Sequence, residues 1–274
     1  MSRWFLSLSL VVIGGLGWRP ASATEATNRP SVERGRDAVA AWQLNPGIWS
    51  VNAYDNIWKV WGLKEKPGHF TQRFRERYGL HAAPYDNHGR PMGLSEVSGL
   101  LGKRLVNSCL LCHAGAVASQ TIIGLGNSTL ELQTLFEELS QADGFRLPMP
   151  YGQMSYVRGT IDPVNPLSFL LEFRDPDLKV QRRVEWGYTG DVCSDPPAWW
   201  LIKKKRTRDW TGGIDARSTR VDMANLLHPL NGGDTIRKHE SMFADIEEFV
   251  HGTEAPKYPF AVDAGLAARG KDRP

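Results

Sequence analysis

The chain has 274 residues, with 33 basic and 30 acidic side chains, a formal net charge of +3 and 41% hydrophobic residues. This length suits one large domain or two small ones. A charge this close to zero gives no sign of a nucleic-acid partner, and bulk electrostatics identifies no other partner.

The first 23 residues have the pattern of a cleavable export signal. Arg3 supplies the positive start, and the apolar run from Trp4 to Trp18 is shorter than the about 20 residues of a membrane span. Ala21-Ser22-Ala23 provides the small residues of a cleavage site. We therefore expect export to the periplasm and no stable membrane span after cleavage, with an uncleaved N-terminal anchor as the alternative. Residues 24–30 are polar and are predicted to form a disordered linker.

Helical signals recur along the rest of the chain as apolar residues at helical spacing and as capping residues. The predicted helices cover Ser31–Trp42, Asn52–Trp61, Pro67–Tyr78, Ser95–Leu105, the stretch from a capping box at Ser128 and Glu131 to about Ala142, Ser218–His228 and Glu240–His251. Turn-rich and irregular connections separate them, and Val180–Trp186 is the one short strand expected. The sequence thus predicts a mostly α fold with long irregular connections and at most minor β structure.

Cys109-Leu110-Leu111-Cys112-His113 is the most informative segment of the chain. The Cys-x-x-Cys-His pattern is the signature of covalent attachment of c-type haem. Two thiols at this spacing can form thioethers with the two vinyl groups of one porphyrin, and the histidine then offers its imidazole to the iron. We expect one covalently attached haem c, with His113 as the proximal ligand.

Two other interpretations of the cysteine pair fit the sequence less well. A thioredoxin-like dithiol requires a βαβ context, and no strand is predicted before Cys109. A zinc site requires a second Cys or His pair at short range, and the remaining cysteine, Cys193, is distant. Cys193 is then an unpaired thiol, which is a buried inert group, a reactive group, a haem-adjacent group or an intermolecular partner.

The sixth iron ligand decides between electron transfer and ligand chemistry. Met149 lies in a loop between Pro148 and Pro150, and Met223 lies on a predicted helix beyond the haem motif. Spacing alone leaves both open, together with a histidine or an open position. The remaining candidates are Met92, Met154, Met242, His69, His81, His88, His228, His239 and His251.

The basic run Lys203-Lys204-Lys205-Arg206 follows an apolar stretch that contains Trp199 and Ile202. We interpret it as a solvated helix end and not as a nucleic-acid patch. Some of its cations could instead neutralise the propionates of the haem.

Segments on both sides of the haem motif carry a resemblance to a known family. They are Gly35–Ala38, Trp58–Leu63, Phe74–His81, Gly124–Asn127, Arg158–Thr160, Phe173–Leu178, Pro197–Lys205, Asp215–Ser218 and Pro256–Phe260. In this order they resemble exported multi-haem c-type cytochromes related to di-haem cytochrome c peroxidases and thiol-oxidoreductase-like proteins. The resemblance implies a cytochrome c-like haem domain over residues 31–260, and it favours Met223 as the second iron ligand.

The C-terminal residues 261–274 resemble the lead into a second Cys-x-x-Cys-His domain, which this sequence does not contain. We expect either a single-haem protein or a fragment of a longer one. The function predicted first is electron transfer to redox partner proteins in the periplasm. The alternative is one half of a di-haem peroxidase-like oxidoreductase with an open iron position, for which Gln153 and Trp186 are candidate distal residues. The sequence identifies no catalytic residue.

Overall fold

The computed structural model describes residues 29–99, 102–144, 155–161, 174–180, 193–208, 212–227 and 231–271. The predicted export signal, most of the linker, Met149, Met154, Gln153, Trp186 and His228 lie outside these ranges, as does nearly all of the strand predicted at Val180–Trp186. Within the described ranges no helix is long and apolar enough to cross a membrane.

Short helices and short strands are interspersed along the described chain, and the elements from α7 onward are all helical. The α-helices are α2 (Val32–Ala40), α3 (Val51–Asn56), α4 (Phe70–Tyr78), α5 (Leu132–Ala142), α7 (Thr219–Met223), α8 (Gly233–Lys238), α9 (Glu240–Gly252) and α10 (Ala264–Lys271). The 3-10 turns are η1 (Ile57–Lys59), η2 (Cys109–Leu111), η3 (Trp199–Lys204) and η4 (Ala224–Leu226). The strands are β1 (Trp49–Ser50), β2 (Leu94–Gly99), β3 (Gly102–Asn107), β4 (Ala114–Val117), β5 (Gln120–Ile123), β6 (Thr207–Arg208) and β7 (Ile214–Asp215).

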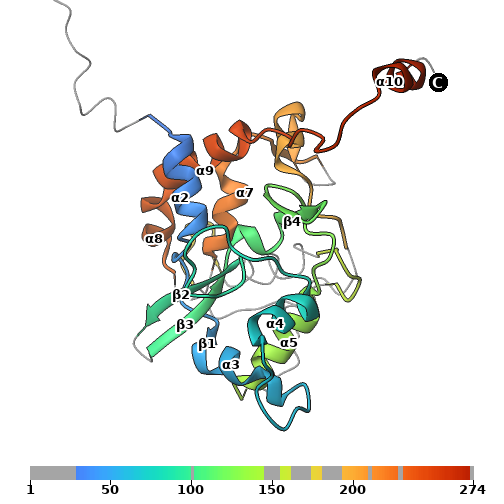
Figure 1. Cartoon of the computed structure of the whole chain (residues 1–274). Coiled ribbons are helices and arrows are strands. Elements are labelled where there is room, and N and C mark those ends of the chain that lie inside the picture. Colours follow the sequence, from blue (N-terminus) through green and yellow to red (C-terminus); the bar gives the residue numbers. More distant parts are fainter. Residues whose placement is uncertain are drawn as a thin grey trace, which may run out of the picture.

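Helices α2 and α9 pack side by side although they stand at opposite ends of the described chain (Figure 1). Gly35 permits the close approach, because a Cβ there would lie 2.0 Å from the carbonyl oxygen of Asp245. The start of α2 is fixed by the Ser31 side chain, which accepts from the Arg34 N–H. The carboxylate of Asp245 accepts from the Ser31 N–H at 2.7 Å, so one residue ties the two helices together.

Two cores of buried side chains lie on either side of the Cys109–His113 segment. The helix-pair core lies around α2, α9 and α7 and includes Val39, Trp42, Met223, Phe243, Ile246 and Val250. The aromatic core lies around α3, α4 and α5 and includes Trp49, Tyr54, Phe74, Tyr78, Leu135 and Phe136. Figure 1 shows these two groups of helices at separate places in the molecule.

The segment predicted as a helix over Ser95–Leu105 is a β-hairpin, and the prediction was wrong. β2 and β3 pair antiparallel from Leu94 opposite Asn107 to Gly99 opposite Gly102, and β1 joins the other side of β3. Two glycines at the turn disfavour a helix, and Gly102 has a φ of +95°. The pairing also brings Glu96 to Lys103, whose ammonium lies 2.6 Å from the carboxylate.

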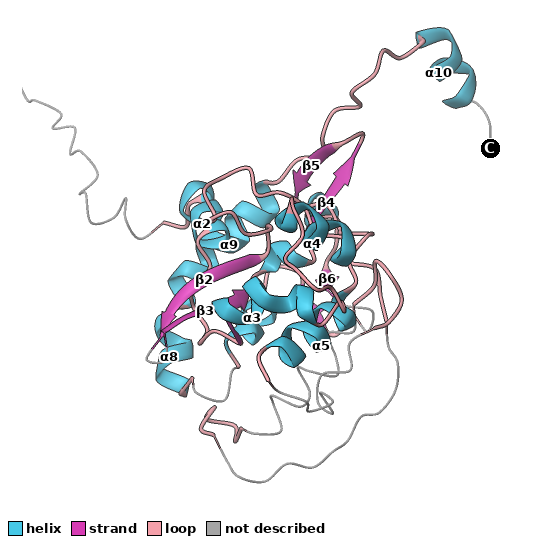
Figure 2. Ribbon diagram, turned by 60° about the horizontal axis from the view of Figure 1, so that its bottom comes forward, coloured by secondary structure: helices cyan, strands magenta, loops and turns pink. Residues whose placement is uncertain are grey.

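The predicted mostly α fold class is also wrong, because the structure is mixed α/β. Its described residues contain a three-stranded sheet, β1-β3-β2, and two two-stranded sheets, β4-β5 and β6-β7 (Figure 2). The strands that the sequence analysis missed are short, and two of them, β3 and β4, flank the Cys109–His113 segment. Short apolar stretches next to glycines carry too little periodicity to separate strand from helix.

Several helix ends agree with the sequence and others do not. α4 ends at Gly79, which has a φ of +65°, as predicted, but begins at Phe70 and not at Pro67. α5 begins after Glu131 without a side-chain cap, so the predicted capping box is wrong. α9 and α2 match their predicted spans closely. α10 has no buried residue and extends away from the body of the protein (Figures 1 and 2).

Candidate functional site

The predicted haem motif forms a single helical turn that begins where β3 ends. The Ser108 hydroxyl accepts from the Leu110 N–H at 3.3 Å and caps η2. The His113 N–H then donates to the Cys109 carbonyl at 3.0 Å. Cys109, Cys112 and His113 therefore all belong to one short, hydrogen-bonded turn.

The turn is anchored between the two cores. Leu110 is buried in the helix-pair core and Leu111 in the aromatic core, each with about 1% of its surface exposed. Gly93 packs against the backbone of the turn, since a Cβ there would lie 2.4 Å from the Leu111 Cα. The φ of Gly93 is +91°, so this position requires glycine on two grounds.

His113 is held by a segment distant in sequence. Its Nδ1 lies 3.1 Å from the carbonyl oxygen of Pro197. A carbonyl can only accept, so this hydrogen bond places the proton on Nδ1 and leaves the lone pair on Nε2. The Trp199 ring lies 5.4 Å from the imidazole at an interplanar angle of 33°.

Backbone hydrogen bonds bring Pro197 to the histidine. The Gly124 N–H donates to the His113 carbonyl at 2.8 Å, and the Trp199 N–H donates to the Gly124 carbonyl at 2.7 Å. Gly126 allows its own segment to contact the segment that contains Pro196, because a Cβ there would lie 1.8 Å from the Pro196 carbonyl oxygen. The residues that follow the β4-β5 hairpin therefore hold both His113 and the segment that contains Pro197 in place.

Burial controls the protonation of all three motif side chains. It lowers the pKa of His113 to about 4, although the Pro197 carbonyl and the charge of Asp222 oppose the shift. The ring is therefore neutral near pH 7, the state in which imidazole binds a metal. Burial raises the pKa of both Cys109 and Cys112 to about 12, and neither cysteine is in a disulfide.

The structure corrects one premise about the rival interpretations of the cysteine pair. A strand, β3, does lead into Cys109, but it is antiparallel and η2 is followed by a hairpin, which is not a βαβ unit. The raised thiol pKa values are also opposite to those of an activated redox dithiol. Among the described side chains, no group of three or more His, Cys, Asp and Glu converges as a zinc site would require.

Met223 lies at the C-terminal end of α7, and 3% of its surface is exposed. It belongs to the helix-pair core, against which Cys109 also packs. The charge of its neighbour Asp222 acts on both Cys109 and His113, so α7 lies beside the haem motif. Burial in this core accounts for a methionine by itself, and iron ligation by Met223 stays a prediction.

The structure also describes Cys193, the basic run and His239, which the sequence analysis singled out. Cys193 is exposed, which rules out a buried inert thiol. The basic run Lys203–Arg206 is exposed at the end of η3, as expected for a solvated helix end, and Lys203 pairs with Glu254. The Nδ1 of His239 lies 2.6 Å from the Thr235 carbonyl oxygen, within its own part of the chain.

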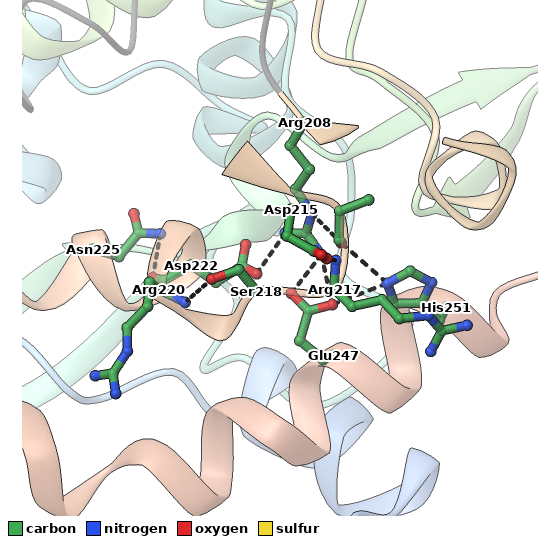
Figure 3. A network of polar contacts seen from close by, with 10 residues as sticks. Arg208, Asp215, Arg217, Ser218, Arg220, Asp222, Asn225, Glu247 and His251 are labelled. Atoms are coloured by element: carbon green, nitrogen blue, oxygen red, sulfur yellow. Dashed lines mark hydrogen bonds and ion pairs between the residues drawn. The ribbon is translucent and has the colours of Figure 1, made fainter. Parts of the chain in front are cut away.

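A buried ionic network near the motif was missed by the sequence analysis (Figure 3). Arg208 lies 2.7 Å from Asp222 and 2.5 Å from Glu247, and it also donates to the Ala216 carbonyl at 2.7 Å. The Glu247 carboxylate lies 3.1 Å from the Nε2 of His251. Burial and the neighbouring Asp222 raise the pKa of Glu247 above its ordinary value, against the opposing charge of Arg208.

One signal in the sequence could have indicated this network. On α9 the buried residues Phe243, Ile246 and Val250 form an apolar stripe, and Glu247 stands within it. A carboxylate at such a position requires a buried cation. The charge of Arg208 acts on His113 and that of Asp222 on both His113 and Cys109, so the network contributes to the electrostatics of the motif.

No protein-family model matches this chain, and a search of curated proteins found no match. The assignment of the site therefore depends on its own geometry and chemistry.

Proposed function

We propose that this protein is an exported c-type cytochrome that carries one covalently attached haem c and transfers electrons to redox partner proteins in the periplasm. Cys109 and Cys112 would hold the haem through thioether bonds, and His113 would bind the iron. When bound, the haem supplies a one-electron redox couple whose potential depends on the axial ligands, on burial and on hydrogen bonding.

The observation that carries the proposal is the contact between His113 and Pro197. A metal-binding histidine donates its second ring N–H to a fixed acceptor, which orients the ring and sets its tautomer. The 3.1 Å distance from Nδ1 to the Pro197 oxygen gives His113 this arrangement. A histidine that served only to fill the core would not need its Nε2 lone pair left available.

The two thiols support the same function. Neither is in a disulfide, and burial raises the pKa of both, which disfavours the thiolate form that a redox nucleophile requires. Cys109 packs against the helix-pair core and Cys112 against the aromatic core, which holds the two sulfurs on one rigid turn. This arrangement suits attachment of one planar group at two fixed points.

Haem staining of the protein after denaturing electrophoresis tests the proposal. The chain is expressed in a host that attaches haem to exported proteins, and the periplasmic fraction is analysed. We expect a stained band for the wild type and for Cys193→Ala, and none for Cys109→Ala with Cys112→Ala. Immunodetection of the unstained variant shows that the chain is present. A stain that survives loss of both cysteines, or a wild type that never stains, overturns the proposal.

A further inference from the structure

The segment that holds the His113 ring continues into a cluster of exposed cations. It begins at Pro197, whose carbonyl accepts from the imidazole at 3.1 Å, and it runs into η3. Pro197 is itself exposed, so one hydrogen bond joins the buried ring to a residue of the surface. We call the three exposed cations at the end of this segment, Lys204, Lys205 and Arg206, the basic patch.

Helix η3 has one buried face and one exposed face. In a 3-10 helix, residues three apart share a face. Trp199 and Ile202 are buried in the helix-pair core, and the Trp199 ring lies edge-on to Phe249 at 5.7 Å between ring centroids. Leu201 and Lys204 are both exposed, and 40% of the Leu201 surface is accessible. Packing of one face therefore holds an apolar side chain and a cation outward on the other.

The basic patch lies close to the haem motif. The Trp199 ring is 5.4 Å from the His113 imidazole. A 3-10 helix rises about 2.0 Å per residue, so Lys204 follows Trp199 after about 10 Å along the helix axis. Hydrogen bonds between His113 and Pro197 and between Trp199 and Gly124 fix the start of the segment. A molecule bound at the basic patch would therefore lie beside the proposed iron ligand.

The cations of the basic patch are not paired. Lys203 forms an ion pair with Glu254, but among the described residues no carboxylate pairs with Lys204, Lys205 or Arg206. The dipole of a helix favours basic residues in its last turn, which accounts for Lys203 and Lys204. It does not account for Lys205 and Arg206, which follow the last residue of η3.

The adjoining segments do not offset this charge. Asp195 and Asp215 are exposed carboxylates there, and Asp215 accepts from the N–H of the exposed Arg217. The Ala216 N–H donates to the Arg206 carbonyl at 3.0 Å, which brings the Arg217 backbone next to the basic patch. Cations thus outnumber carboxylates on this surface, in a chain whose overall charge is only +3.

We propose that the basic patch and Leu201 form the docking surface for an acidic electron-transfer protein. This inference rests on the proposed function. In the exchange the acidic protein gains one electron and the haem iron changes from ferrous to ferric, with no bond formed or broken. Opposite charges accelerate the encounter and orient the two proteins, and an exposed apolar residue beside the charges supplies a short-range contact.

Fluorescence anisotropy of a labelled oligoglutamate peptide tests binding at this surface. The haem-attached protein should bind the peptide saturably, and added salt should weaken the binding. The triple variant Lys204→Gln, Lys205→Gln, Arg206→Gln should lose about fivefold or more in affinity. The charge-matched control is Lys64→Gln, Arg73→Gln, Lys238→Gln, which removes three exposed cations from other places and should keep the wild-type affinity. Thermal unfolding checks that both variants are folded.

Electron transfer to small oxidants of opposite charge provides a second readout. The reduced protein is mixed with hexacyanoferrate(III), an anion, or with tris(phenanthroline)cobalt(III), a cation, and each reagent accepts one electron. The triple patch variant should react about fivefold or more slowly with the anion and no more slowly with the cation. The control variant should react like the wild type with both reagents.

The outcomes separate this inference from the proposed function. A chain that never stains for haem overturns both. A stained protein overturns the docking surface alone if the patch variant and the control variant behave alike, or if the patch variant slows with both reagents, because the haem itself is then altered. Tighter binding of an oligodeoxynucleotide of the same charge than of oligoglutamate would assign the basic patch to nucleic acid and would also overturn the docking surface.

Discussion

His113 and Pro197 are 84 residues apart in the chain, and a hydrogen bond of 3.1 Å joins the imidazole Nδ1 of one to the carbonyl of the other. This contact determines which ring nitrogen of His113 is free. It depends in turn on Gly124 and Trp199, whose backbone groups link the two segments. The tautomer and orientation of His113 are therefore properties of the folded chain and not of the pentapeptide alone.

Gly93→Ala should damage the motif more than an otherwise similar change at Gly89. Both glycines have positive φ values, +91° and +69°, so each substitution costs about 1–2 kcal/mol for the left-handed backbone. Only Gly93 contacts the motif, and a Cβ there would overlap the Leu111 backbone, which adds about 1–3 kcal/mol. Urea unfolding measures both variants. If Gly93→Ala and Gly89→Ala lost the same free energy of unfolding, the contact between position 93 and Leu111 would add nothing, and the prediction would be wrong.

Arg208→Met should be among the most destabilising single substitutions in the chain. It leaves the buried Glu247 and its neighbour Asp222 without their cation, at a cost of about 3–5 kcal/mol. Addition of Glu247→Gln to this variant should recover part of the loss, because a charge is then removed. Arg217→Met, an exposed change in the same region, should alter the free energy of unfolding by less than about 0.5 kcal/mol. A double variant that is less stable than Arg208→Met alone would contradict the prediction.

Met223→Leu tests iron ligation by a methionine. Met223 and Met92 are both buried in the helix-pair core, so exchange of either for leucine conserves volume and should cost less than about 1.5 kcal/mol. Absorption spectra of the ferric protein reveal methionine ligation through a weak far-red band. We expect Met223→Leu to abolish this band and Met92→Leu to retain it. Persistence of the band in Met223→Leu would assign the ligand to another residue.

The stability of the aromatic core should depend on the ionisation of Glu138. Its carboxylate accepts from Trp61 at 3.0 Å, from Arg77 at 2.7 Å and from the Tyr78 hydroxyl. Burial alone would raise the pKa of Glu138, but the hydrogen bonds from Arg77 and Tyr78 outweigh it and hold the pKa below its ordinary value. The ionised form is thus favoured in the folded state.

The sign of the pH dependence follows from this lowered pKa. The stabilisation is present above the ordinary Glu138 pKa of 4.5, which applies in the unfolded chain, and is lost as the pH falls through the lower folded pKa. Glu138→Gln should therefore be less stable than the wild type near pH 7, with a difference that narrows below about pH 4.5. Unfolding in urea across this range provides the measurement, with the exposed Glu248→Gln as the control. A constant difference at all pH values would contradict the prediction.

Much of the helical framework follows from local signals in the sequence. Ser31 begins α2 and Gly79 ends α4 because capping depends on residues only a few positions apart. The β2-β3 hairpin was predicted as a helix because each strand is defined by its pairing with the other strand. A short apolar segment next to glycines does not show which residues it will pair with. The mixed α/β class follows from such pairings and could not be obtained from periodicity.

The sequence by itself determined the chemistry that is possible at Cys109, Cys112 and His113, because it sets two thiols and an imidazole at this spacing. The tertiary structure alone decided the protonation states, by burying the thiols and by placing Pro197 at the Nδ1 of His113. It also decided that Arg208 meets Glu247, 39 residues away. The physical reason is the same in each case: burial and long-range hydrogen bonds depend on which distant segments pack together, and no short pattern encodes that.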